Sequence, residues 1–308
     1  MEGRHLVKAA AFAAVVVAGA LAVGTPADSP STTAPPDLAS PTSLDPVETA
    51  STPSTFADPP QANNSLSTAA PTSTAPLRSA TVSFSGDSRL PSRVWRVGAS
   101  WADENDADGY DFTSMFGPVE QQIADADWSV CHMEVNLAAD NQGLSSYPIF
   151  SGPGAIAEDL RAVGFDVCST ASNHSLDGRT EATFETIDVL EAAGLRAVGT
   201  ARSAQEAMTG IWFDVAGIRI AHLAYAYGFN GFRLPEDQPW AANQIDEQRI
   251  LDDAAAARAD GADFVVLSLH WGDQYRHEPS AQQADLGPRL LSSDDIDLII
   301  GHHAHVVQ

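Results

Sequence analysis

The sequence predicts an α/β fold built on a mostly parallel sheet, and two features of residues 79–308 predict it. Short β-rich runs alternate with helical segments of about 10–15 residues, which is the pattern of βαβ units. The runs 264–269 and 296–300 are apolar at nearly every position, as expected for strands that are covered on both faces. This region is long enough to form one large domain.

The expected elements follow from hydrophobic periodicity and from the residues that end each segment. We expect strands at 80–85, 127–132, 165–169, 195–198, 264–269 and 296–300. We expect helices at 119–126, 154–163, 180–193, 246–260 and 282–291. Gly164 and Gly194 stand where helices end, because glycine adopts the left-handed conformation of a helix C-terminus easily. The runs 211–215 and 218–224 flank Ala216–Gly217 and predict a β-hairpin.

The N-terminal part has the composition of an export segment and a spacer. Arg4 and Lys8 precede an apolar run at 9–23, which is shorter than the roughly 20 residues of a membrane span. Residues 1–27 are therefore expected to be a cleaved signal peptide or a retained N-terminal anchor. Residues 28–78, rich in Ser, Thr and Pro, are expected to be a disordered linker. We expect the rest of the chain to be extracytoplasmic, either secreted or held at the cell surface.

The net charge of the chain argues against one class of partner. A formal net charge of −25 argues against nucleic acid, because binding phosphates requires clustered Lys and Arg.

Cys131 and Cys168 both lie in apolar runs that are predicted to be strands. A disulfide between them requires neighbouring strands and stays possible, but two buried free thiols are the favoured interpretation.

Polar residues with metal-binding side chains follow the predicted strands. They are Asp87, Glu134, Asn173, His174, His270, His302, His303 and His305. In open α/β sheets, ligands bind at the carboxyl ends of the strands, so these side chains are expected to meet at one edge. Imidazole and carboxylate without thiolate suit Zn, Mn or Fe. Two such metals need a bridging carboxylate, and we assign Asp87 to that position.

Most of these residues also have an ordinary structural explanation when taken singly. Asp87 follows Gly86 and could cap a turn. Glu134 could be solvated or could pair with Arg89, and His270 could be a hydrogen-bonded core residue. Asn173–His174 could begin a helix. Three histidines within four positions after a buried strand have few structural uses, and the shared edge therefore favours a metal site.

The order of these motifs resembles a known family. Gly86–Asp87, Glu134, ASNHSLDG at 171–178, HWGDQY at 270–275 and GHHAHVVQ at 301–308 are similar to the CapA family of poly-γ-glutamate capsule-synthesis proteins. The resemblance covers about residues 80–308. It implies a metallophosphatase-like layered α/β sandwich that holds two divalent transition-metal ions. The implied metal ligands are Asp87, Glu134, Asn173, His270, His303 and His305, and the implied catalytic residues are His174 as acid and Asp87.

The sequence departs from the family pattern in several places. His132 stands where the family usually has Asn, so His132 either replaces that contact or adds a ligand. Ala304 replaces a proline between the last histidines. Among His302, His303 and His305 we favour the last two as ligands, because a His-x-His pair on an extended segment projects both rings to one side. Family members continue beyond the position of Gln308, so we expect the domain to be truncated and its C-terminal strands to be missing.

The expected function is metal-dependent hydrolysis outside the cell, in the synthesis, export or anchoring of an anionic polymer such as poly-γ-glutamate. The substrate is expected to be that polymer or a phosphoester, and the partners to be membrane-bound polymer ligase or export subunits. Two alternatives remain open. One is a non-catalytic, membrane-tethered assembly factor, and the other is a general exported phosphoesterase.

Overall fold

The computed structural model describes residues 78–105, 109–209 and 211–308. Within these residues the strands are β1 (Val82–Ser88), β2 (Trp128–Met133), β3 (Asn136–Ala138), β4 (Ser151–Pro153), β5 (Val167–Ser169), β6 (Arg196–Val198), β7 (Trp212–Val215), β8 (Ile218–Ala226), β9 (Phe264–His270) and β10 (Leu298–His302). The helices are α1 (Ser92–Glu104), α2 (Thr113–Phe116), α3 (Glu120–Ala124), α4 (Ile156–Val163), α5 (Arg179–Ala192), α6 (Ala204–Thr209), α7 (Glu247–Ala259) and α8 (Ala281–Leu291).

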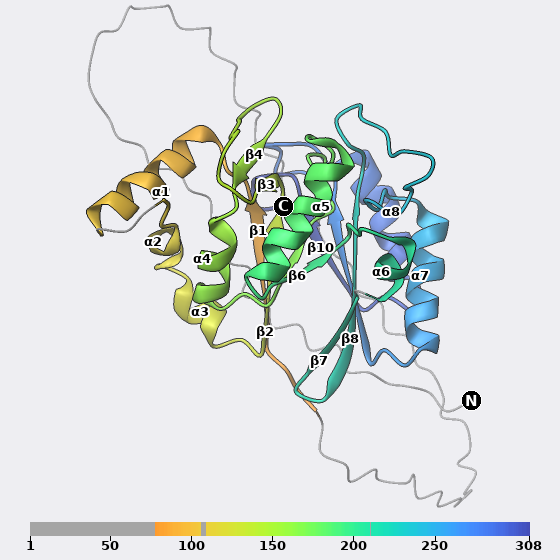
Figure 1. Cartoon of the computed structure of the whole chain (residues 1–308). Coiled ribbons are helices and arrows are strands. Elements are labelled where there is room, and N and C mark those ends of the chain that lie inside the picture. The colour runs from red at the N-terminus through yellow and green to blue at the C-terminus, as the bar shows by residue number, and fades with distance from the viewer. Residues whose placement is uncertain (1–77, 106–108, 210) are drawn as a thin grey trace, which may run out of the picture. The chain divides into compact units, whose positions relative to one another are not determined.

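Two four-stranded sheets form the centre of the described region (Figure 1). The first has the order β1-β2-β5-β6 and is parallel throughout. The second has the order β10-β9-β8-β7 and is parallel except for the β7–β8 hairpin. The predictions of a mostly parallel α/β fold and of this hairpin are confirmed. The parallel strands are divided between two sheets, however, and do not form one continuous sheet.

Side-chain alternation gives each sheet two apolar faces, and this produces four layers. Val130 of β2 and Val266 of β9 belong to one core that both sheets share. Leu160 of α4 packs in a second core with the first sheet, and Leu290 of α8 packs in a third core with the second sheet. Figure 1 shows the two sets of helices on opposite sides of the strands. The layered α/β sandwich that the family resemblance implied is therefore present.

The largest differences from the expected elements lie near Asp87. Strand β1 continues to Ser88, so Asp87 lies inside a strand and not after its end. Helix α1 follows directly, where the sequence predicted no element. Pro91 stands just before its first turn, a position where the missing N–H costs nothing. Gly98 allows α1 to approach the Phe112 ring, because a Cβ there would lie 2.6 Å from that ring.

Cys131 and Cys168 form a disulfide, so the expectation of two free thiols is wrong. The two residues are direct partners on the neighbouring parallel strands β2 and β5, with their Cα atoms 4.4 Å apart. Sequence alone does not show which strands are neighbours or how they are aligned. The pairing therefore depends on tertiary structure.

We expect reduction of this disulfide to lower the free energy of unfolding by about 2–4 kcal/mol, because it closes a long loop in the unfolded chain. The two cysteines are 37 residues apart in sequence. Urea unfolding of the protein with and without dithiothreitol measures the effect without changing side-chain volume. The Cys131→Ala/Cys168→Ala variant should be insensitive to dithiothreitol. Equal urea midpoints for oxidised and reduced wild-type protein would contradict the prediction.

The expected signal peptide or anchor at 1–27 and nearly all of the expected linker lie outside the described residues. Arg78, which we assigned to the end of the linker, contacts the folded part through an ion pair with Asp263 (Nη2–Oδ1, 2.9 Å). Within the described residues, no helix combines the length and the apolar character that crossing a bilayer requires.

Candidate metal centre

Three strands each carry a histidine near their carboxyl end, on the face that points between the two sheets. Alternate residues of these strands, such as Val130 and Ile300, face the core between the two sheets. Further along the same face, each strand carries a histidine. These residues are His132 on β2, His270 on β9 and His302 on β10. The face that is apolar in the middle of the sandwich therefore becomes polar at one edge of it.

A β-bulge in β1 turns Asp87 to the same inward side. Phe84 pairs with Val130 and Asp87 pairs with His132, so three steps along β1 match two steps along β2. Regular alternation would place Phe84 and Asp87 on opposite faces. The extra residue at 85–86 restores the inward direction, which is a common use of bulges beside functional sites.

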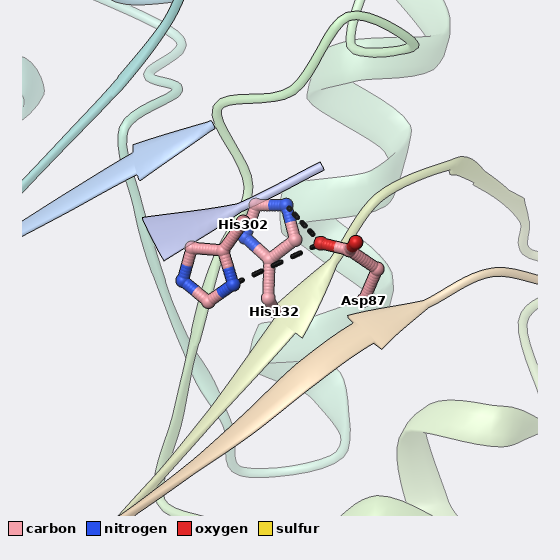
Figure 2. Close-up of side chains that lie close together, drawn as sticks. All are labelled: Asp87, His132 and His302. Atoms are coloured by element: carbon pink, nitrogen blue, oxygen red, sulfur yellow. Dashed lines mark ion pairs between the residues drawn. The ribbon is translucent and has the colours of Figure 1, made fainter. Parts of the chain in front are cut away.

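The Asp87 carboxylate lies at the centre of the histidine cluster. Its Oδ1 atom is 3.6 Å from His132 Nε2, 3.8 Å from His270 Nδ1 and 3.8 Å from His302 Nδ1. Its Oδ2 atom is 2.9 Å from His305 Nδ1, and the backbone N–H of His303 donates to the carboxylate at 3.0 Å. Figure 2 shows His132 and His302 with their rings directed at the carboxylate. The position suits a bridging ligand.

Glu134 is the second carboxylate of the site and is almost fully buried. Neither of its side-chain oxygens has a hydrogen-bond partner among the described residues. Oε1 lies 3.7 Å from His305 Nε2 and 4.0 Å from His174 Nε2. Burial and then the charge of Asp87 raise the pKa of Glu134 well above its usual value. A buried carboxylate without donors is costly unless a cation neutralises it.

The donor atoms form three groups with the spacing of metal ligands. The groups are Asp87–His132–His302, Glu134–His270–His303 and Asp87–Glu134–His305, each with donor atoms within 4.8 Å of one another. Both ring nitrogens of His302 and Nε2 of His305 are buried without a hydrogen-bond partner in the described part of the chain. A transition metal bound among these atoms would satisfy the unpartnered nitrogens and carboxylate oxygens. The residues present therefore fit a metal centre.

Asn173 lies at the cluster as a hydrogen-bond partner of one of its histidines. Its Oδ1 atom is 2.8 Å from His270 Nε2, and its Nδ2 atom donates to Asn230 Oδ1 at 3.1 Å. Of the residues expected as metal ligands, Asp87, Glu134, His270, His303 and His305 fall in the three groups, and Asn173 borders them. His132 and His302 join them. The structure thus brings all the expected residues together at one edge of the sandwich.

The reason given above for favouring His303 and His305 is wrong, although both rings reach the cluster. Both residues follow β10 in a turn and have left-handed backbones, with φ of 87° and 54°. They are not on an extended segment. His302 is the strand residue, and all three histidines contribute donor atoms. A turn that places non-glycine residues at positive φ is uncommon and often marks a functional site.

His174 lies beside the three groups without belonging to any of them. Its Nδ1 atom is 2.7 Å from Asp177 Oδ2, and its ring meets the edge of Phe150 with centroids 4.7 Å apart. The Asp177 carboxylate fixes the tautomer with a proton on Nδ1, so Nε2 is left facing Glu134. This histidine–carboxylate pair has the arrangement of a general acid or base that is held in place by its partner.

Sequence reasoning missed two residues that position His174. Asp177 stands three residues after His174 in the ASNHSLDG motif, so the signal was present but unused. Asn230 had no signal beyond its place in an Asn-Gly pair, which is typical of turns. Its side chain contacts Asn173 and lies 3.3 Å from His174 Nδ1.

Burial determines the protonation of the histidine cluster. It lowers the pKa of His132 and His270 well below the usual value, and the neighbouring histidines lower it further. Burial lowers the pKa of His303 to about 4. For Asp87, burial acts to raise the pKa, but the His305 hydrogen bond and the electrostatic interaction with nearby histidines lower it overall. His132, His270 and His303 are thus held as neutral imidazoles beside the ionised carboxylate of Asp87, which is the protonation that metal binding requires of these residues.

We expect the metal-free protein to lose stability as pH falls from about 7 to 5. Five buried histidines have lowered pKa values, so the unfolded chain, with pKa near 6.5, binds more protons than the folded protein in this window. They are His132, His222, His270, His302 and His303. Glu134 acts in the opposite direction, but it is one group against five.

Urea unfolding in EDTA at several pH values between 7 and 5 measures this dependence. The His277→Gln variant, which changes an exposed histidine, should keep the wild-type slope. Stability that is independent of pH in this window would contradict the prediction.

The fold and the donor set together define an α/β protein with a candidate histidine–carboxylate metal centre. A family described as bacterial capsule synthesis protein PGA_cap matches residues 81–308. The chain belongs to this family.

Two curated relatives carry similar descriptions. The capsule biosynthesis protein CapA of Bacillus anthracis is 29% identical over 152 residues, which is 48% of this chain and 37% of that protein. The PGA biosynthesis protein CapA of Bacillus subtilis is 29% identical over 151 residues, 48% of this chain and 39% of that protein. The matched part thus spans well under half the length of these relatives.

Solved structures with partial similarity include two nucleotidases. A 5'-nucleotidase precursor from Thermus thermophilus is 18% identical, with a TM-score of 0.33 over 48% of this chain and 28% of that chain. The NAD nucleotidase of Haemophilus influenzae is 16% identical, with a TM-score of 0.34 over 48% of this chain and 28% of that chain. The family assignment rests on the family model.

Proposed function

We propose that this protein is an extracytoplasmic, metal-dependent hydrolase that acts in the synthesis, export or anchoring of an anionic polymer such as poly-γ-glutamate. One observation carries the proposal. Two groups of metal-ligating side chains share no residue, and a third group joins them through one carboxylate from each. This arrangement is typical of a two-metal site. The relatives' descriptions support the link to capsule polymer.

The donor groups suggest how the ligands would be divided between two ions. Asp87, His132 and His302 would hold one ion, and Glu134, His270 and His303 would hold the other. Asp87 and Glu134, with His305, would lie between them. When bound, such a metal pair lowers the pKa of a coordinated water and stabilises charge on the reacting oxygens.

His174 would donate the proton to the leaving group. Nδ1–H is held by Asp177, so only Nε2 is available to exchange a proton with a substrate. The Asp177 carboxylate would also balance the positive charge of the ring when Nε2 carries a proton. Asn230 contacts both His174 and Asn173, and thus limits rotation of the side chains beside the metal ligands.

The disulfide supports the proposed location. Disulfides form and persist mainly in oxidising compartments outside the cytoplasm. Cys131 and Cys168 are fully buried on the neighbouring strands β2 and β5. The basic and apolar N-terminal sequence described above is consistent with export.

Metal analysis combined with an activity assay tests the proposal. We expect the purified protein to bind close to two equivalents of Mn, Zn or Fe and to hydrolyse a phosphoester or a γ-glutamyl oligomer only with metal present. Less than about one equivalent would contradict the metal centre. Full metal content without turnover of any substrate tested would instead favour the non-catalytic assembly factor.

A further inference from the structure

A cavity near His174 is lined by cationic and aromatic side chains. Its volume is about 250 Å³, and its walls include Leu176, Arg179, Phe232 and Arg233. The Arg179 guanidinium lies over the Phe232 ring, 4.4 Å from the centroid. The pocket also contains one acid, Glu181, so its lining keeps a net positive charge.

Arg179 and Arg233 bring two positive charges to one pocket of a very acidic chain. The sequence has 16 Lys and Arg against 41 Asp and Glu. Several described arginines form ion pairs with carboxylates, namely Arg78, Arg161, Arg202, Arg249, Arg258 and Arg289. Within the described residues, Arg179 and Arg233 have no carboxylate at ion-pair distance. Both charges line the same pocket, and this points to an anionic ligand.

Each wall of the pocket lies a few residues along the chain from a residue that contacts His174. Arg179 comes two residues after Asp177, which binds His174 Nδ1. Phe232 comes two residues after Asn230, which lies 3.3 Å from the same nitrogen. Two residues span at most about 7 Å, so the backbone of each pocket wall lies within about 7 Å of the backbone of a residue that contacts the proposed proton donor.

A tight turn holds the second wall in place. Asn230 and Gly231 have φ of 49° and 85°, and the Phe232 N–H donates to Phe229 O at 2.8 Å. This is the geometry of a two-residue type I′ turn. The turn directs Asn230 to the site and Phe232 to the pocket, so the two regions are structurally coupled.

We propose that this pocket is a subsite for a carboxylate of a polyanionic chain, adjacent to the unit that reaches the metal centre. The inference rests on the proposed function and names the substrate class as a polycarboxylate. A guanidinium presents a fork of donors that matches a carboxylate bidentately. Stacking on Phe232 orients Arg179, and the N-terminus of α5, which begins at Arg179, adds positive potential.

Binding of a labelled decamer of γ-linked glutamate to the metal-loaded protein tests this subsite. Fluorescence anisotropy at fixed ionic strength should show about tenfold weaker binding in Arg233→Gln, and a larger loss in the Arg179→Gln/Arg233→Gln variant. Arg233 forms no ion pair in the described part of the chain, so its exchange should leave the fold intact. Arg96→Gln is the matched control, because Arg96 is also without a carboxylate partner in the described region but lies on α1.

Three results would overturn the subsite. These are no decamer binding by the wild type, equal binding by the wild type and the double variant, or equal loss in Arg96→Gln. A phosphate oligomer of the same length that binds more tightly through the same arginines would overturn the carboxylate assignment. The proposed hydrolase is judged separately: arginine-dependent binding without turnover would sink that function and leave the subsite standing. Turnover of a small phosphoester with arginine-independent binding would do the reverse.

Discussion

Exchanging Asp87 for asparagine is expected to weaken metal binding by more than about 100-fold and to remove most metal-dependent turnover. Loss of an outer partner of a metal ligand already costs about 10–100-fold in affinity, and Asp87 belongs to two of the three donor groups. Asparagine has nearly the same shape and can still accept the His303 N–H. The variant therefore removes the charge between the histidines and keeps the local structure.

Isothermal titration with Zn²⁺ and elemental analysis measure the effect. Asp159→Asn is the matched control, since Asp159 is half-buried on α4 and accepts the Phe112 backbone N–H at 2.7 Å. It should retain wild-type metal content. The far-ultraviolet spectra of both variants should match the wild type. Wild-type metal affinity in Asp87→Asn would show that Asp87 is not a ligand.

Exchanging His174 for glutamine is expected to lower kcat by about 10²–10⁴-fold while metal content stays unchanged. His174 is outside all three donor groups, so the metal ligands remain complete. The variant loses a ring nitrogen that Asp177 orients toward Glu134, and it leaves both carboxylates in place. The effect should therefore appear in the chemical step and not in metal binding.

The leaving group gives a sharper test of this role. A proton donor matters most when the departing oxygen is strongly basic. The His174→Gln loss should be large for an alkyl phosphoester and small for a p-nitrophenyl phosphoester. The exposed His277 supplies the control variant, His277→Gln, which should hydrolyse both substrates at the wild-type rate. Equal losses on both substrates would exclude a general-acid role for His174.

Much of the fold could be predicted because its signals are local. The apolar run at 264–269 and the Gly-terminated helical segment at 180–193 correspond to β9 and α5. The turn residues Ala216–Gly217 correctly predicted the hairpin of β7 and β8. Helix α1 was missed although apolar residues such as Val94 and Trp95 recur along it and pack against the core, so the local signal was present but unused.

The candidate site was predictable in its membership and not in its geometry. Each candidate stands near the carboxyl end of a strand, which is a property of position in sequence. His302 was underweighted because its partner Asp87 is distant in sequence. Asp177 was underweighted because its pairing with His174 was not considered. His302 reaches Asp87, which is far away in sequence, through the neighbouring edges of two different sheets. No local pattern encodes that approach.

Local sequence signals were sufficient for the α/β class, the order of most strands and helices, and a set of histidines and carboxylates near strand ends. These properties follow from side-chain periodicity and turn residues, which act over a few positions. Four features emerged only in three dimensions: the division into two sheets, the bulge that turns Asp87 inward, the left-handed turn of His303 and His305, and the Cys131–Cys168 disulfide. Each of them depends on which distant segments become neighbours and in what register, and long-range packing sets that choice.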